Sequence, residues 1–158
     1  MIVAMGQKNE IGRNNDLLWH LPDDFKWFIK HTKHKTVIMG RNTMNSLGKP
    51  LKNRRNIVLS SSNKDIIDGF EYYNSLADVL DSLLNEEEIM IIGGAKLYNS
   101  ALSLSKRIYL TKVDATFDDA DTYFTNLDYN EWDITYKEYH DSDDTHLYPF
   151  EFQILERR

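Results

Sequence analysis

An acidic side chain lies among aromatic ones in residues 19–28 of the sequence. Pro22 suits the first position of a helix, because its missing N–H would have no partner inside the helix. Asp24 then falls in the first turn, where the helix dipole favours negative charge. Residues three and four apart are neighbours on a helix, so Phe28 lies beside both Asp24 and Phe25. This spacing predicts a carboxylate surrounded by rings.

Two interpretations of Asp24 are open at this point. A helix-start acid can simply stabilise its helix through the dipole, by about 0.3–1 kcal/mol. Alternatively, an acid buried among rings loses hydration, and its ionised form needs a cationic or hydrogen-bonding partner. A ligand amidine or a protonated ring nitrogen would be such a partner, and Thr111 on a later apolar run could add a supporting hydroxyl.

Three polar junctions, each directly after an apolar run, could bind phosphate groups. Residues 40–43 (Gly-Arg-Asn-Thr) add a guanidinium fork, residues 93–96 (Gly-Gly-Ala-Lys) allow close backbone approach, and residues 60–62 are serines. Neither the P-loop pattern nor G-x-G-x-x-G is present, and each junction alone could be a plain turn. At one edge of a parallel sheet, however, the three together favour a ligand with several phosphates.

The composition excludes several other kinds of chemistry. The chain has no cysteine, which excludes disulfides, thiolate metal sites and cysteine nucleophiles. Its five histidines have no metal-ligand spacing, and no Ser-His-Asp arrangement is supported, so we predict no metal site. The net charge of −6 argues against nucleic acid as a partner. We find no signal peptide or membrane-spanning run and expect a cytoplasmic protein.

The elements that must position these residues alternate along the chain. We expect buried strands at 2–5, 36–39, 56–60, 88–92 and 107–113, and a short strand at 71–73. Helices are expected at 22–31, 41–47 and 95–102, with a further helix that starts at Ser75 and buries an apolar face including Leu84. Residues 6–16 and 61–63 are expected to form polar loops.

The C-terminal part has a different pattern. Residues 132–140 and 148–156 alternate and carry aromatics, which predicts an antiparallel hairpin. The whole pattern predicts an α/β fold in a single domain, 1–158, because a chain of 158 residues suits one core. We expect a mainly parallel, twisted central sheet of about eight strands, flanked by about four helices.

Five motifs follow one another in order. They are Trp19-x-Leu21-Pro22-x-Asp24, Val37-Ile38-Met39-Gly40-Arg41-x-Thr43, Pro50-Leu51-x-x-Arg54-x-Asn56-Ile57, Ile91-Ile92-Gly93-Gly94 and Tyr109-Leu110-Thr111. This set closely resembles bacterial, chromosomal-type dihydrofolate reductases, from near residue 2 to the end of the chain. The resemblance implies a monomeric antifolate target that uses NADPH to reduce 7,8-dihydrofolate to tetrahydrofolate. Hydride would pass to the pterin C6, and a proton would be added at N5.

The resemblance also implies roles for individual residues. Asp24 would bind the pterin N3 and 2-amino group and help supply the proton through water, while Arg54 would hold the substrate's α-carboxylate. The implied catalytic residues are Asp24, Thr111, Trp19 and Leu17. The implied substrate contacts are Ile2, Val3, Ala4, Asp24, Phe25, Phe28, Leu47, Leu51, Arg54, Ile92, Tyr98 and Thr111.

For the cofactor, Arg41 and Ser61, with Ser62 nearby, would receive the adenosine 2′-phosphate, and residues 93–94 would share a cis peptide bond. Residues 6–21 would form a mobile loop beside the nicotinamide. The implied NADPH contacts are Ala4, Ile11, Gly12, Asn15, Leu17, Gly40, Arg41, Asn42, Thr43, Leu59, Ser60, Ser61, Ile92, Gly93, Gly94, Ala95, Lys96, Leu97 and Tyr98.

The chain departs from the family pattern at a few positions. Leu18 replaces a frequent proline, and the acidic loop 118–121 is one residue longer, so contact between Asp121 and the mobile loop is left open. Two alternatives remain: a related NADPH reductase acting on a pteridine-like or ribosylaminopyrimidine substrate, and a non-catalytic nucleotide sensor. Asp24 and the Gly93-Gly94 pair favour the reductase of dihydrofolate.

Overall fold

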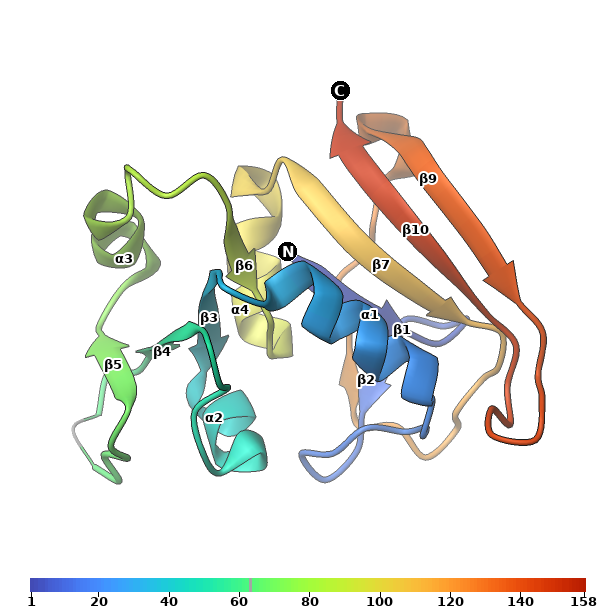
Figure 1. Ribbon diagram of the computed structural model, residues 1–158, viewed down its shortest axis with the longest axis horizontal. Coiled ribbons are helices and arrows are strands. Elements are labelled where there is room, and N and C mark those ends of the chain that lie inside the picture. The colour runs from blue at the N-terminus through green and yellow to red at the C-terminus, as the bar shows by residue number, and fades with distance from the viewer. Residues whose placement is uncertain (63) are drawn as a thin grey trace.

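The computed structural model describes residues 1–62 and 64–158, in which helices and strands alternate as the sequence predicts (Figure 1). Asn63, expected in a polar loop, lies outside the described residues. One four-stranded sheet is entirely parallel. Its order is β5 (Phe70–Tyr73), β4 (Arg55–Leu59), β3 (Thr36–Gly40) and β6 (Ile89–Ile91).

The second four-stranded sheet joins the parallel part of the fold to the predicted hairpin. Strands β1 (Ile2–Met5) and β7 (Arg107–Val113) are parallel, whereas β10 (Phe150–Arg157) is antiparallel to both β7 and β9 (Trp132–His140). The mainly parallel α/β architecture and the C-terminal antiparallel strands are therefore confirmed.

Helices cover both faces of the all-parallel sheet. Successive residues of a strand point to opposite sides of its sheet, so a strand that is apolar throughout needs a packing partner on each side. In β3, Ile38 joins one hydrophobic cluster, which also receives α3 (Leu76–Ser82) and α4 (Ala95–Ala101). Its neighbours Val37 and Met39 join a second cluster, which receives α1 (Pro22–Thr32) and α2 (Arg41–Leu47). Single 3₁₀ turns follow at Leu102–Leu104 and Tyr129–Glu131.

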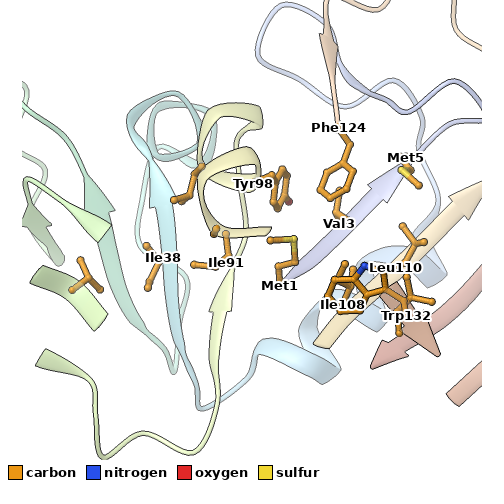
Figure 2. Close-up of a cluster of buried hydrophobic side chains, with 14 of the residues drawn as sticks. Met1, Val3, Met5, Ile38, Ile91, Tyr98, Ile108, Leu110, Phe124 and Trp132 are labelled. Carbon is orange, nitrogen blue, oxygen red and sulfur yellow. The ribbon is translucent and has the colours of Figure 1, made fainter. Parts of the chain in front are cut away.

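The first cluster unites the two sheets (Figure 2). Ile38 and Ile91 come from the all-parallel sheet, Val3 and Leu110 from the mixed sheet, and Tyr98 from α4. These five side chains are at most 6% exposed, so the sheets share one apolar interior. Burial of apolar area at roughly 25 cal/mol per Å² is the main stabilising contribution here.

Some expectations about individual elements were wrong. The loop expected at 6–16 contains β2 (Glu10–Gly12), which pairs with β8 (Thr122–Tyr123). A three-residue strand is too short to show alternation, so only its distant partner defines it. Leu84 is 81% exposed, because α3 ends at Ser82. The predicted start of α3 is confirmed, since the Ser75 side chain accepts a hydrogen bond from the Asp78 amide.

Candidate active site

The structure brings together an acid and a hydroxyl that are 87 positions apart in the sequence. Asp24 lies in the first turn of α1, and Thr111 lies in the middle of β7, where it pairs with Ala4 of β1. The Thr111 hydroxyl donates a hydrogen bond to Asp24 Oδ1 over 2.6 Å. Thr111 is only 1% exposed, so the strand fixes this donor in place.

The electrostatic environment of Asp24 favours a ligand that donates hydrogen bonds. Loss of hydration raises the pKa of its carboxyl to about 6, and the Thr111 hydrogen bond opposes that rise. Among the described residues, no Lys, Arg or His nitrogen lies within 4.0 Å of this carboxylate. A neighbouring cation would have lowered the pKa instead. Asp24 is therefore a carboxylate with acceptor capacity that the described side chains leave free.

A cavity of about 800 Å³ opens beside Asp24. This volume is typical of small-molecule sites. Twelve residues expected at the substrate or catalytic site line it: Ile2, Val3, Ala4, Leu17, Trp19, Asp24, Phe25, Phe28, Leu47, Ile92, Tyr98 and Thr111. Phe25 reaches the wall while remaining 62% exposed. The acid is therefore part of the wall of a largely apolar cavity.

Two residues expected at the substrate site do not line this cavity. Leu51 packs half-buried against the second hydrophobic cluster, and its amide donates to Asn56 Oδ1. Arg54 donates from Nε to Thr32 Oγ1 over 3.0 Å and from Nη1 to the Lys52 carbonyl over 2.7 Å. Arg54 thus lies against the last residue of α1, at the opposite end of that helix from Asp24.

A smaller cavity of about 210 Å³ continues the first, and the two share Ala4, Leu17 and Tyr98 among their lining residues. Ten residues expected at the cofactor site line the smaller cavity: Ala4, Ile11, Gly12, Asn15, Leu17, Thr43, Ile92, Gly93, Gly94 and Tyr98. Nine expected residues do not line it. Six of them are neighbours in the sequence of lining residues: Gly40, Arg41 and Asn42 precede Thr43, and Ala95, Lys96 and Leu97 follow Gly94. Leu59, Ser60 and Ser61 lie at the end of β4.

The first residue of the glycine pair has a backbone conformation and a close neighbour that disfavour a side chain. The bond between Gly93 and Gly94 is cis, and Gly93 has φ +113°. A Cβ on Gly93 would stand 3.1 Å from the Tyr98 ring. The Gly40 amide donates to the Gly93 carbonyl over 2.8 Å, which ties the start of α2 to the start of α4. Two of the three predicted junctions therefore meet.

Arg41 connects the junction at residues 40–43 to the serines at residues 60–62. Its Nε and Nη2 donate to Ser60 Oγ over 3.0 and 2.8 Å, and Nη2 also donates to the Ser62 carbonyl over 2.8 Å. Nη1 donates to the Lys64 carbonyl over 2.7 Å. These four hydrogen bonds leave part of the five-donor guanidinium for a ligand. Ser61 is exposed beside this cluster.

The long loop before α1 is attached to neighbouring segments at Gly12, Asn14 and Asn15. The Asn14 amide donates to Asp121 Oδ2 over 2.9 Å, and the Asp121 amide donates to the Gly12 carbonyl over 3.0 Å. The hydrogen bond from Asn14 lowers the pKa of Asp121. Asn15 Nδ2 reaches the Asn42 carbonyl over 2.8 Å. The contact that the sequence left open, between Asp121 and this loop, is therefore present.

Several lining residues escaped the sequence analysis. Ser46, on the same face of α2 as Thr43, lines both cavities and could have been found from its helical spacing of three. Asp16, His20, Lys26 and Thr122 also line a cavity, but no local pattern marks them, whereas Leu21 and Pro22, which line it too, belong to the first of the five motifs. The described residues contain no cluster of three His, Cys, Asp or Glu fit to hold a metal. No helix in the same residues is long and apolar enough to cross a membrane.

Comparisons with known proteins agree with this geometry. The family model for dihydrofolate reductase matches residues 1–157. The Bacillus subtilis dihydrofolate reductase is 39% identical over 157 residues, covering 99% of this chain and 93% of that protein. The Haemophilus influenzae enzyme of the same name is 39% identical over 158 residues, covering 100% and 98%.

A solved structure shares the fold. It is a dihydrofolate reductase from Enterococcus faecalis complexed with NADP(H) and RAB-propyl, with a TM-score of 0.91 and 30% sequence identity. The match covers 99% of this chain and 94% of that one.

Proposed function

The chain belongs to the dihydrofolate reductase family, and from this we propose that it reduces 7,8-dihydrofolate to 5,6,7,8-tetrahydrofolate with NADPH as cofactor. The observation that carries the proposal is the Asp24 carboxylate, hydrogen-bonded to Thr111 and enclosed in an apolar cavity without a cationic partner among the described residues. A pterin ring offers paired donors, N3–H and the 2-amino group, which match the two oxygens of a carboxylate.

We assign the chain's own residues the following roles. Asp24 binds and orients the pterin as a carboxylate, and because its pKa is raised to about 6, a minor fraction carries a proton near neutral pH for delivery through water to N5. Thr111 fixes the carboxylate, and Trp19 and Leu17 close the cavity around the reacting ring. When bound, NADPH supplies the hydride that reduces C6.

The described residues fit such a cofactor. The smaller cavity is lined by Ala4 and Tyr98 among others, and Gly93 and Gly94 line it without side chains. At the edge beyond, the Arg41 guanidinium is oriented by its hydrogen bonds to Ser60 Oγ, and together with the exposed Ser61 it is suited to a phosphate dianion. We propose that this edge selects NADPH over NADH, because the two differ only in the 2′-phosphate.

The decisive experiment follows the loss of NADPH absorbance when 7,8-dihydrofolate is added to purified protein, with NADH as the control. We expect NADPH-selective oxidation, and antifolates should block it by occupying the cavity beside Asp24. Folded protein that binds NADPH but leaves dihydrofolate unreduced would instead favour the related pteridine or aminopyrimidine reductase. Protein that binds nucleotide but reduces neither substrate would favour a sensor.

A further inference from the structure

The first turn of α1 lacks a cap of its own. Its N-cap residue, Leu21, has no side-chain acceptor, and Pro22 has no N–H. The Asp24 and Phe25 amides donate to the Leu21 carbonyl. The Asp23 amide is the remaining donor of this turn, and it reaches His146 Nε2 over 3.1 Å, from 123 positions away. A side chain from outside the helix thus completes its first turn.

His146 is held in one orientation by its own loop. Its side chain is 4% exposed, and Nδ1 lies 2.9 Å from Asp143 Oδ1 and 3.0 Å from Thr145 Oγ1. Hydrogen bonds from His146 and the Thr145 backbone lower the pKa of Asp143 to about 2, so this carboxylate is ionised. An ionised acceptor at Nδ1 places the imidazole proton there and leaves the Nε2 lone pair for the Asp23 amide.

Strand β7 and the loop that leads into β10 therefore hold the start of α1 at two points. Thr111 on β7 binds the Asp24 carboxylate, and His146, four residues before Phe150 at the start of β10, binds the adjacent amide. Phe150 and Val113 are paired between these strands. A shift of the first turn by a fraction of an ångström would misplace Asp24 relative to its ligand.

We propose that His146, oriented by Asp143, is a positioning residue for Asp24: it fixes the first turn of α1 so that the carboxylate meets the substrate ring in one geometry. This inference rests on the proposed function, because it assigns Asp24 to dihydrofolate. His146 itself does not line the cavity. Its effect is transmitted through the backbone of Asp23.

Other charged groups also face this arrangement. The Asp23 carboxylate lies 3.8 Å from Nε2, too far for a hydrogen bond, and 3.7 Å from Lys26 Nζ. The alternative to the neutral His146 ring is an imidazolium with both ring nitrogens protonated, held between the Asp23 and Asp143 carboxylates. At Asp24 itself, Thr111 is the hydrogen-bonding neighbour, and the Tyr98 phenol is a nearby titratable group whose pKa is raised by burial and by Asp24.

The two arrangements are separated by ¹⁵N NMR of the His146 ring in the full chain at pH 7. We expect a protonated Nδ1 and an unprotonated Nε2. Protonation of both nitrogens would overturn the inference, because Nε2 could not then accept from the Asp23 amide. This measurement needs neither substrate nor turnover.

The functional test compares His146→Leu with His146→Gln, whose Oε1 can occupy the position of Nε2 as an acceptor. His146→Leu should lower kcat/KM for dihydrofolate roughly fivefold to tenfold, because Asp24 loses its fixed geometry. It should also move the pKa near 6 in the pH profile downward, since a loosened turn hydrates the carboxyl, while NADPH affinity changes less than about twofold. His146→Gln should restore most of the rate and the profile.

Equal losses in both variants with an unchanged pH profile would show a merely structural role and overturn the inference, as would full activity in both. Wild-type protein that does not reduce dihydrofolate would refute the proposed function instead. In that case ¹³C NMR titration of the Asp24 carboxyl decides the inference: a pKa that falls in His146→Leu but not in His146→Gln supports it, and an unmoved pKa overturns it.

Discussion

Asp24, in the larger cavity, and Arg41, beside the serines after β4, are two charged residues of the candidate site whose surroundings differ. Among the described residues the Asp24 carboxylate accepts one hydrogen bond, from Thr111, and loss of hydration raises its pKa to about 6. Arg41 makes four hydrogen bonds to the loop after β4. The acid is poorly satisfied by the protein, whereas the guanidinium is oriented before any ligand arrives.

The difference indicates how each residue would bind a ligand. A desolvated carboxylate gains most from a ligand that brings paired donors, because the ligand supplies what water no longer does. A preoriented guanidinium near the surface gains less binding free energy per contact, but its planar fork selects an anion with paired oxygens, such as phosphate. Asp24 should therefore decide catalysis, and Arg41 the choice of cofactor.

The largest effect is expected from Asp24→Asn. At pH 7, kcat/KM for dihydrofolate should fall roughly a hundredfold or more, because the acid that assists protonation is lost. At pH 5 the loss should be much smaller, since the substrate then arrives protonated. Steady-state kinetics across this range measure the effect, with Asp81→Asn on the exposed face of α3 as the control. Equal losses at every pH would mean that Asp24 only orients the ring.

Arg41→Ala should weaken NADPH binding roughly tenfold to a hundredfold, the usual effect of losing hydrogen bonds to a charged group. NADH binding should change less than about threefold. Fluorescence titration with both cofactors tests this difference. Arg55→Ala is the matched control, because Arg55 pairs with Glu71 outside both cavities. If both cofactors weaken equally, Arg41 does not read the 2′-phosphate.

Asp24→Asn should also stabilise the fold at neutral pH. The folded pKa of about 6 exceeds the usual value of 3.8, so the folded state binds the proton more tightly and stability falls as pH rises between these values. Because the cavity admits some solvent to this residue, we expect a gain of about 1–2 kcal/mol at pH 7. Urea unfolding at pH 7 and below pH 4 measures it; an equal gain at both would exclude this charge effect.

The smallest effect is expected from Thr111→Val. The substitution keeps the branched shape on β7 but removes the hydroxyl that donates to Asp24 over 2.6 Å. Without that donor the pKa of Asp24 should rise further above 6, and kcat/KM at pH 7 should change only a few-fold, in line with the roughly 1 kcal/mol of a single hydrogen bond. A pH profile identical to wild type would show that Thr111 does not influence the acid.

Local patterns were sufficient for much of the fold. The apolar run of β3 was readable because residues 36–39 form a short apolar stretch before Gly40, and the start of α1 because Pro22 fits only the first helical turn. The same reasoning missed β2, since three residues carry no period, and misplaced Leu84, since nothing local marks the end of α3 at Ser82.

The sequence by itself determined which residue types stand at the strand ends and that an acid begins α1 among aromatic rings. Only the tertiary structure decided that the acid loses its hydration, that Thr111 binds it while His146 binds the adjacent amide, and that Arg41 meets Ser60. Those properties depend on groups 19 to 123 positions apart, and desolvation arises only when distant elements exclude water together.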